Sequence, residues 1–424
     1  MPKLRLRGSS RLTFASFSNA AKALGFIQID DPNTPDAMVD GLTTVFSTVN
    51  EQRQRVSTFD AFLPRETALK REKHLTICTN TILSRIAFSK DNGVPRPNRV
   101  FFKLADPNLT KYTRLKSKEK SLFARALWAH LNGIGPRKHL EEYGISVVKD
   151  LPGVGSGLKI PVKELLTRLV IHPMLGVLEF FKYMIFRSGI LSMPINNITL
   201  FVRSKILNQD YTGIDNEKLA TASSQIQDLI LDIELMPLAV TAMDDLEEHQ
   251  RLFPKMGMFS ILATLAKPKS RGTVRLGSSG PHQRPKVDFG ILSNPEDYIV
   301  ARASVRLSLK LAETMRASGF PLQENITFPE DKQAKDAKND NNEEIDNFIM
   351  RRIRTIYHYS SSCRMAPADD TESPGVVDDQ LKVHGVKGLR VCDTSIFPQI
   401  ISHHLQAPVV MVAEKCADLI KTHG

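Results

Sequence analysis

The C-terminal part of the chain, from residue 353 onward, carries the pattern that most constrains the fold. The run Gly388–Cys392 is compact and mostly apolar, and an aspartate follows it, which predicts a buried strand. A Ser-rich loop containing His358 precedes this run, and a loop with the adjacent residues His403 and His404 follows it. From Pro408 onward, apolar residues recur at helical spacing, at positions 409, 410, 412, 413, 416, 417, 419 and 420. The pattern predicts a strand–loop–helix unit with a histidine loop at each edge.

The predicted C-terminal helix affects the chemistry of the loop before it. The first N–H groups of a helix have no partner within the helix and carry partial positive charge, so they favour an anion. Here they would point at whatever occupies the loop beside His404. Two imidazoles that titrate near neutral pH, next to an anion-stabilising helix end, suit proton transfer coupled to hydride transfer.

The same segment closely resembles the C-terminal end of the glucose–methanol–choline (GMC) oxidoreductases, a family of FAD-dependent enzymes that includes glucose oxidase, choline oxidase and aryl-alcohol oxidase. The family pattern begins with a histidine five residues before a cysteine and ends with a loop before Ala-Pro. Each of its pieces occurs here in order and at the family spacing: His358 to Cys363, Gly375-Val-Val-Asp378, Val383-His-Gly-Val-Lys-Gly-Leu-Arg-Val391, Asp393-Thr-Ser395 and Ala407-Pro408.

A second resemblance lies in the middle of the chain. The runs Asn132–Pro136 and Asp150–Gly155 match the family's Ser-Gly-Ile-Gly-Pro and Asp-Leu-Pro-Gly-Val-Gly, and their glycines allow tight turns and a close approach to a cofactor. Two departures flank them. Residues 121–130 are shorter than the family's strand and Ala-Gly-Ala turn, and Gly157-Leu158 runs directly into Lys159 where the family has Asn/Gln-Asp-His. We expect a deletion at both places.

The resemblance implies a reaction and a set of site residues. GMC enzymes oxidise an alcohol: a base removes the hydroxyl proton while a hydride passes to N5 of FAD. By position, His358 and His404 are the catalytic pair, one the base and the other its hydrogen-bond partner, in an order that the sequence leaves open. The implied cofactor-binding residues are Leu83, through its backbone, and Asp393, Thr394, His403 and Gln406.

Each assignment has a plainer alternative. His358 alone would be interpreted as a loop histidine bonded to nearby serines, and His404 as a neighbour of a helix cap. The intact motif favours the catalytic interpretation for both. Asp378 and His384 are interpreted as residues that order a turn rather than react, and His403 as a residue that faces the flavin or packs.

The fold class that follows is α/β, or α+β overall. We expect an incomplete FAD-binding, Rossmann-like domain and a substrate domain with an antiparallel sheet and helices. The expected divisions are residues 1–158 (middle part of the FAD-binding domain), 159–350 (substrate domain) and 351–424 (C-terminal part of the FAD-binding domain). The expected elements are helices at 16–25 and 301–319, a core helix within 175–193, two strands or one bent strand at 75–88, strands at 198–203 and 258–266, a turn and strand at 268–276, and a surface loop at 329–347.

Composition excludes several classes of protein. The net charge of +11 is spread along the chain without a dense basic block, which favours a solvated basic surface over nucleic-acid binding. No apolar stretch approaches the length of a membrane span. The four cysteines show neither metal-ligand spacing nor a disulfide framework. The first residues lack a secretory apolar run, so we expect a cytoplasmic protein as the chain stands, or a secreted one if its natural N-terminus lies upstream.

One expected feature is missing. FAD-binding members of the family begin with a strand, a Gly-x-Gly-x-x-Gly turn and a helix that takes the pyrophosphate, and no such fingerprint occurs here. The chain therefore corresponds to roughly the last two-thirds of a GMC protein. The leading hypothesis is an FAD-dependent alcohol oxidase or dehydrogenase that acts on a small-molecule alcohol. The alternative is a flavin-free, catalytically inactive homologue that acts by binding, and a basic nucleic-acid binder is a remote third.

Overall fold

The computed structural model divides the chain into two compact units. The first unit contains residues 1–75, 162–267 and 296–356, and the second contains residues 76–161, 268–295 and 357–424. Within them the structure describes residues 9–31, 40–45, 48–51, 54–75, 77, 81–104, 113–116, 130–152, 154, 156–158, 180–181, 184–186, 198–222, 230–238, 259–280, 283–320, 322, 342–371, 373–402 and 404–423.

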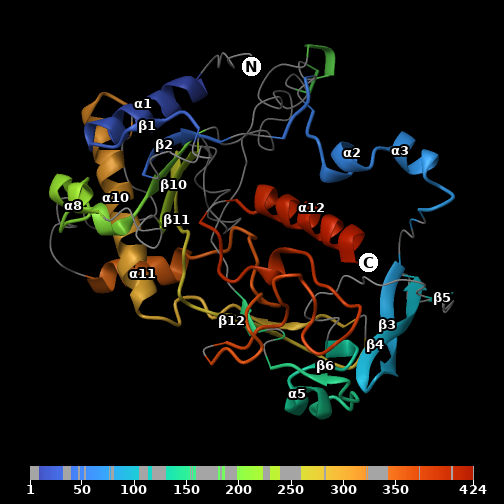
Figure 1. Ribbon diagram of the computed structural model, residues 1–424. Helices are drawn as coiled ribbons and strands as arrows, with labels where there is room; N and C mark the ends of the chain where they lie inside the picture. Colours follow the sequence, from blue (N-terminus) through green and yellow to red (C-terminus); the bar gives the residue numbers. More distant parts are fainter. Residues whose placement is uncertain are drawn as a thin grey trace. The chain divides into compact units, whose positions relative to one another are not determined.

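A five-stranded sheet organises the first unit. Its strand order is β1-β2-β9-β10-β11; β1 and β2 are parallel and the other neighbours are antiparallel. Helix α10 contacts both β10 and β11, and α1 contacts α10 (Figure 1). The elements are α1 (Ser9–Ala23), β1 (Gln28–Ile29), β2 (Gly41–Thr44), α2 (Thr58–Phe62), α3 (Arg65–Lys70), β9 (Ile198–Val202), η2 (Ser204–Ile206), α8 (Asn216–Thr221), β10 (Ile233–Leu238), β11 (Ser260–Leu265), α10 (Glu296–Ala317) and α11 (Asn342–Arg352).

The sequence of α10 explains its place against the sheet. Ala303, Leu307, Leu311 and Met315 recur every four residues and are fully buried, so one face of the helix enters the core. A buried ion pair adds a polar contact within the same unit. Asp40, just before β2, accepts hydrogen bonds from the main-chain N and the Nε of Arg203, at 2.7 and 2.6 Å.

Three small sheets and a long helix form the second unit. In the β3-β4-β5 sheet, Asn92 and Gly93 have φ of +50° and +80°, which a two-residue hairpin turn of type I′ requires. The elements are β3 (Thr81–Asp91), β4 (Val94–Leu104), β5 (Thr113–Lys116), β6 (Ile134–Gly135), α5 (Arg137–Glu142), β7 (Lys149–Asp150), β8 (Ser156–Leu158), β12 (Gly272–Arg275), β13 (Lys286–Asp288), η5 (Thr394–Ile396) and α12 (Gln406–His423).

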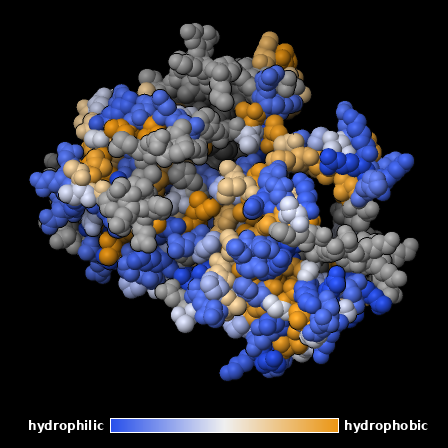
Figure 2. All heavy atoms as spheres, viewed as in Figure 1, coloured by the Kyte–Doolittle hydropathy of each residue, from blue (hydrophilic) through white to orange (hydrophobic). Residues whose placement is uncertain are grey.

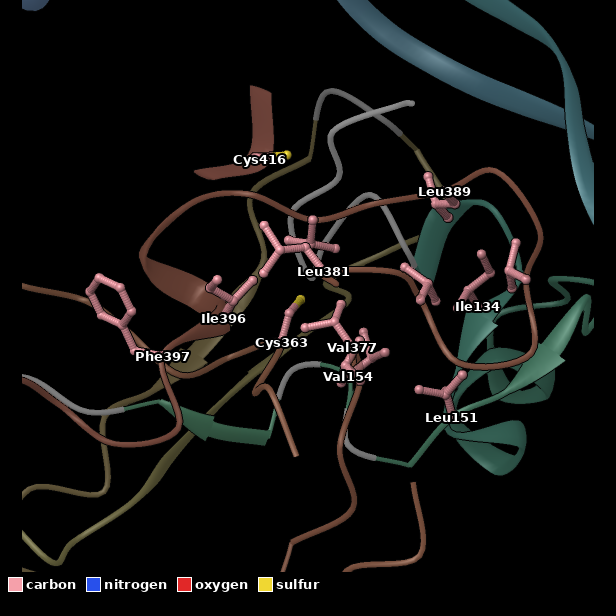
Figure 3. Close-up of a cluster of buried hydrophobic side chains, with 14 of the residues drawn as sticks. Ile134, Leu151, Val154, Cys363, Val377, Leu381, Leu389, Ile396, Phe397 and Cys416 are labelled. Atoms are coloured by element: carbon pink, nitrogen blue, oxygen red, sulfur yellow. The ribbon is translucent and has the colours of Figure 1, made fainter. Parts of the chain in front are cut away.

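The hydrophobic core of the second unit joins segments that lie far apart in the sequence. Cys363, Val377, Leu381 and Ile396 gather at its centre (Figure 3), and all four are buried. Residues 134–154 supply Ile134, Leu151 and Val154, and α12 supplies Cys416 and Leu419. This core therefore lies beneath the loops that carry His358 and His404.

Two glycines of the middle motif, Gly133 and Gly135, serve the protein's own packing. Gly133 has a φ of +79°, and a Cβ at this position would collide with the carbonyl oxygen of Ser146. A Cβ on Gly135 would collide with the ring of His130. Both glycines are thus required by close contacts inside the second unit, a role that the sequence alone does not distinguish from approach to a cofactor.

Most expected elements are confirmed, as is the mixed α/β fold class. Helix α1 begins earlier than expected, at Ser9, and α10 begins at Glu296. Of the two strands or one bent strand expected at 75–88, the structure describes one strand from Thr81 onward, β3, whose register shifts between Leu83 and Arg85. Residues 76, 78–80 and 258 lie outside the described residues. The functional assignment of the three expected domains stays a prediction.

Three expectations were wrong. Gly388–Cys392 is buried at Leu389 and Val391 but forms only one bridge, Lys382↔Arg390, because tight turns at Gly385 and Gly388 fold it back on its own neighbours. Residues 342–347 of the expected surface loop begin α11, because Ile345 and Ile349 are four residues apart and both buried. The described residues of the expected core helix, 180–181 and 184–186, are helical but exposed. The remainder of these two segments lies outside the described residues.

Hydrophilic residues cover much of the described surface in Figure 2, interrupted by smaller hydrophobic areas. Among the described residues, no helix is long and apolar enough to cross a membrane, and no group of three histidine, cysteine or acidic side chains is placed to hold a metal ion.

Stability should depend on the protonation of His130. This side chain is fully buried, and burial, followed by the charges of His139 and Arg275, lowers its pKa from 6.5 to about 4. Between these two pH values the unfolded chain binds a proton that the folded chain excludes, so stability falls as the pH decreases from 6.5 to 4, by about 3 kcal/mol in total.

Chemical denaturation at a series of pH values tests this dependence. His130→Gln should flatten the slope of unfolding free energy against pH in this window. The control Ile134→Val changes an apolar residue in the hydrophobic core of the second unit and involves no titratable group. It should lower the unfolding free energy by the same amount at every pH and keep the slope. An unchanged slope in His130→Gln would show that His130 does not cause the pH dependence of stability.

Candidate active site

The two histidines of the C-terminal motif meet in the second unit. Nε2 of His358 lies 2.8 Å from Nδ1 of His404, and the ring centroids are 5.0 Å apart at an interplanar angle of 73°. Both side chains are half-buried. A hydrogen bond between two imidazoles needs an N–H on one ring and a lone pair on the other. The arrangement therefore disfavours two doubly protonated rings and keeps at least one imidazole neutral.

Main-chain hydrogen bonds bring the two loops together. Ser361, Cys363 and Met365 donate their N–H groups to the carbonyls of Thr394, Ser395 and Ile396, at 3.2, 2.8 and 2.7 Å. This pairing aligns the segment after His358 with η5, the 3₁₀ turn that precedes the His404 loop. Alternate residues donate, as in an extended strand, so the spacing of the motif is fixed by backbone geometry.

Asp393 and Thr394, two expected cofactor-binding residues, lie at the start of η5. The Asp393 side chain accepts a hydrogen bond from the N–H of Ser395 at 2.8 Å and so caps the turn. Both side chains are half-buried. The carboxylate has further lone pairs beyond the one that this cap uses, so the capping role and a ligand role are compatible.

The N-terminus of α12 lies two residues after His404. Gln406 is the first residue of the helix and is exposed, and the first turn contains no acidic side chain. The N–H groups of this turn therefore keep the partial positive charge that favours an anion. His403 lies outside the described residues.

Leu83 is located apart from the other expected site residues in the fold. Its side chain is buried in a small cluster with Ile86 and Val100, and it pairs with Phe102 next to the shift in strand register. Within the described part of the chain, no hydrogen bond or ring contact joins Leu83 to the histidine pair. A buried side chain leaves only the backbone for a ligand, which is the role that the resemblance implies.

Asp378 and His384 order the turn, as expected. Asp378 Oδ1 accepts hydrogen bonds from the N–H groups of Gln380 and Lys382, at 2.9 and 2.8 Å. His384 Nε2 lies 2.9 Å from the carbonyl oxygen of Ala366. Because a carbonyl only accepts, this nitrogen carries the proton. Both side chains are thus engaged with backbone.

The cysteine of the histidine motif is a core residue, which sequence reasoning did not identify. Cys363 is 1% exposed, and burial raises the pKa of its thiol to about 12. A thiol with this pKa stays protonated near neutral pH and is a poor nucleophile. Its place in a Ser-rich loop gave no sign of burial. Cys416 is buried and Cys392 partly so, whereas Cys78 lies outside the described residues.

Comparison with known proteins places this geometry in a family. Residues 268–413 match the model of the GMC oxidoreductase C-terminal domain. The chain is 30% identical to dehydrogenase str4 of Strobilurus tenacellus over 427 residues, which covers 94% of this chain and 66% of the relative. It is 28% identical to the oxygen-dependent choline dehydrogenase of Vibrio vulnificus, with 96% and 67% covered. The chain belongs to the GMC oxidoreductase family.

Solved structures of the family share the fold. An FAD-dependent oxidoreductase from Chaetomium thermophilum matches with a TM-score of 0.76 at 21% identity, covering 97% of this chain and 72% of that one. Formate oxidase from Aspergillus oryzae matches with a TM-score of 0.74 at 24% identity, covering 97% and 70%. The chain spans about two thirds of the length of the curated GMC relatives it matches.

Substitution of Asp378 tests the structural role of this side chain in its turn. Asp378→Ala removes the acceptor of two main-chain hydrogen bonds and should lower the unfolding free energy by about 1–2 kcal/mol, measured by chemical denaturation. Asp378→Asn keeps a side-chain oxygen at the same place and should retain most of the stability. Equal losses in the two variants would show that the oxygen does not hold the turn.

Proposed function

We propose that this chain oxidises the CH–OH group of a small alcohol with FAD as hydride acceptor. The observation that supports it best is the hydrogen bond between His358 and His404, two residues that the family motif brings from loops 46 positions apart. An imidazole with a pKa near neutrality suits removal of a hydroxyl proton at physiological pH. The second imidazole holds the first in one orientation and tautomer.

The geometry of the pair is compatible with the following proton path. The shared hydrogen bond uses Nε2 of His358 and Nδ1 of His404, so the alcohol is met by one of the other two ring nitrogens. The ring that takes the hydroxyl proton becomes an imidazolium, and its neighbour accepts a hydrogen bond from it. In this proposal the base and its partner are in contact, and experiment decides which histidine is which.

The residues around the pair fit part of an FAD molecule. When bound, the flavin supplies the hydride acceptor. Asp393 offers a carboxylate for hydroxyl groups, and Thr394 lies next to it in the same turn. The first turn of α12, with Gln406, favours the negative charge that a reduced flavin carries. The backbone at Leu83 would meet the adenine end.

The relatives support alcohol oxidation over a purely binding role. They include a choline dehydrogenase, an aryl-alcohol oxidase and a pyridoxine 4-oxidase. These differ in substrate but agree in redox chemistry. The flavin-free alternative is therefore less favoured, although this chain matches only about two thirds of the relatives' length.

Absorption spectroscopy with added FAD tests the proposal directly. The purified chain should give the spectrum of a bound flavin after excess FAD is removed, and the spectrum should bleach anaerobically with one of a panel of alcohols. A protein that stays colourless in excess FAD would contradict the proposal and favour the binding alternative.

Substitution of His404 tests the base assignment. In flavin-loaded protein, His404→Ala should reduce the rate of alcohol-dependent flavin reduction about a hundredfold or more, because proton abstraction is lost while flavin binding remains. The control His74→Ala changes an exposed histidine of the first unit and should keep the parent rate. An unchanged rate in His404→Ala would remove this residue from the mechanism.

A further inference from the structure

His358 presents its ring to His404 from a segment without regular secondary structure. The bond between the rings is 2.8 Å long, and such a bond weakens steeply as its angle bends. Main-chain bonds to η5 hold the described part of this segment from Ser361 onward, three residues after His358. The contacts of the residues directly beside His358 also bear on the direction of its ring.

An aromatic stack holds the residue next to His358. The ring of Tyr359 is parallel to the ring of Phe289, with centroids 5.9 Å apart and an interplanar angle of 3°, an offset-stacked arrangement that aromatic rings favour. The ring of Tyr357 meets Tyr359 edge-on, with centroids 6.4 Å apart. The residues on both sides of His358 therefore belong to one aromatic cluster, formed by Phe289, Tyr357 and Tyr359.

The turn that carries Phe289 provides a firm support. Phe289 follows β13, which pairs with β12, and Asp288 Oδ1 accepts a hydrogen bond from the N–H of Gly290 at 2.9 Å. Gly290 has a φ of +58°, and a Cβ at this position would collide with the backbone of Arg271. The turn is therefore tightly constrained, and Phe289 is held by it.

Burial does not explain the cluster. Phe289 and Tyr359 are 36% and 38% exposed, and Tyr357 is 69% exposed. Tyr357 also has a φ of +61°, a left-handed conformation that is uncommon for a bulky residue and persists only where the surroundings impose it. The unusual backbone thus occurs at the residue immediately before His358, where the direction of the ring is decided.

We propose that Phe289 and Tyr359 are positioning residues that hold the His358 imidazole in hydrogen-bonding contact with His404. The stack anchors the loop on one side of His358, and the main-chain bonds from Ser361 onward anchor it on the other. The effect on the His358–His404 bond is independent of flavin. The effect of the stack on catalysis rests on the proposed function.

NMR of the flavin-free chain labelled with ¹⁵N-histidine tests the structural effect. His358→Gln and His404→Gln identify the signals of the pair. Tyr359→Ala and Phe289→Ala should move these signals toward those of imidazoles without the shared bond. Tyr359→Phe keeps the stack and should retain the parent signals. Val287→Ala, which changes an exposed residue of β13 two positions before Phe289, is the matched control and should also retain them.

Two results would overturn the proposal. One is that the signals of the pair stay unchanged in both alanine variants. The other is that Val287→Ala moves them as far as Phe289→Ala does. Should an alanine variant unfold, Phe289→Leu decides in its place, because leucine keeps apolar bulk and removes the stack; unchanged signals there would equally overturn the proposal.

A kinetic measurement separates this inference from the proposed function. In flavin-loaded protein, Tyr359→Ala should lower the limiting rate of flavin reduction about tenfold, since a displaced catalytic group loses its alignment, and Tyr359→Phe should restore it. If the parent itself reduces no flavin, the proposed function fails while the NMR result still decides on the stack. If the parent reduces flavin and Tyr359→Ala matches its rate, the positioning role in catalysis is wrong.

Discussion

The C-terminal site depends on three main-chain hydrogen bonds, from Ser361, Cys363 and Met365 to the carbonyls of η5. They join two loops that the chain separates by a turn and a return segment, and they set how far His358 and His404 are from each other. Because these bonds are made by backbone, they constrain the number of residues between positions more than the side chains at those positions. The core beneath them then fills the space between the aligned segments.

Periodicity and local signals explain what could be predicted. Helices α10 and α12 have long apolar stripes, and β9 and β11 have apolar, strand-forming runs, so tertiary contacts did not override their patterns. The pairing of His358 with His404 followed from the family motif rather than from periodicity, since neither loop has a period. The prediction of a surface loop at 329–347 was wrong at its end, because Ile345 and Ile349, four residues apart, bury one face of a helix despite the charged residues around them.

Contacts distant in sequence explain what could not be predicted. Phe289 and Tyr359 are 70 positions apart, and no local pattern relates a residue at the end of a hairpin to one in a Ser-rich loop. The run Gly388–Cys392 has the composition of a strand. Its conformation depends instead on two glycine turns, whose backbone angles cannot be read from composition. The division of the chain into two compact units, each made of three separate segments, likewise depends on which segments share a core.

The burial of the cysteines has a consequence for redox chemistry. Burial is the main cause that raises the pKa of Cys363 and of Cys392 to about 12, so both thiols stay almost fully protonated near neutral pH. Hydrogen peroxide attacks thiolates rather than thiols. These two sulfurs, although close in sequence to His358 and Asp393, are therefore expected to react slowly with peroxide.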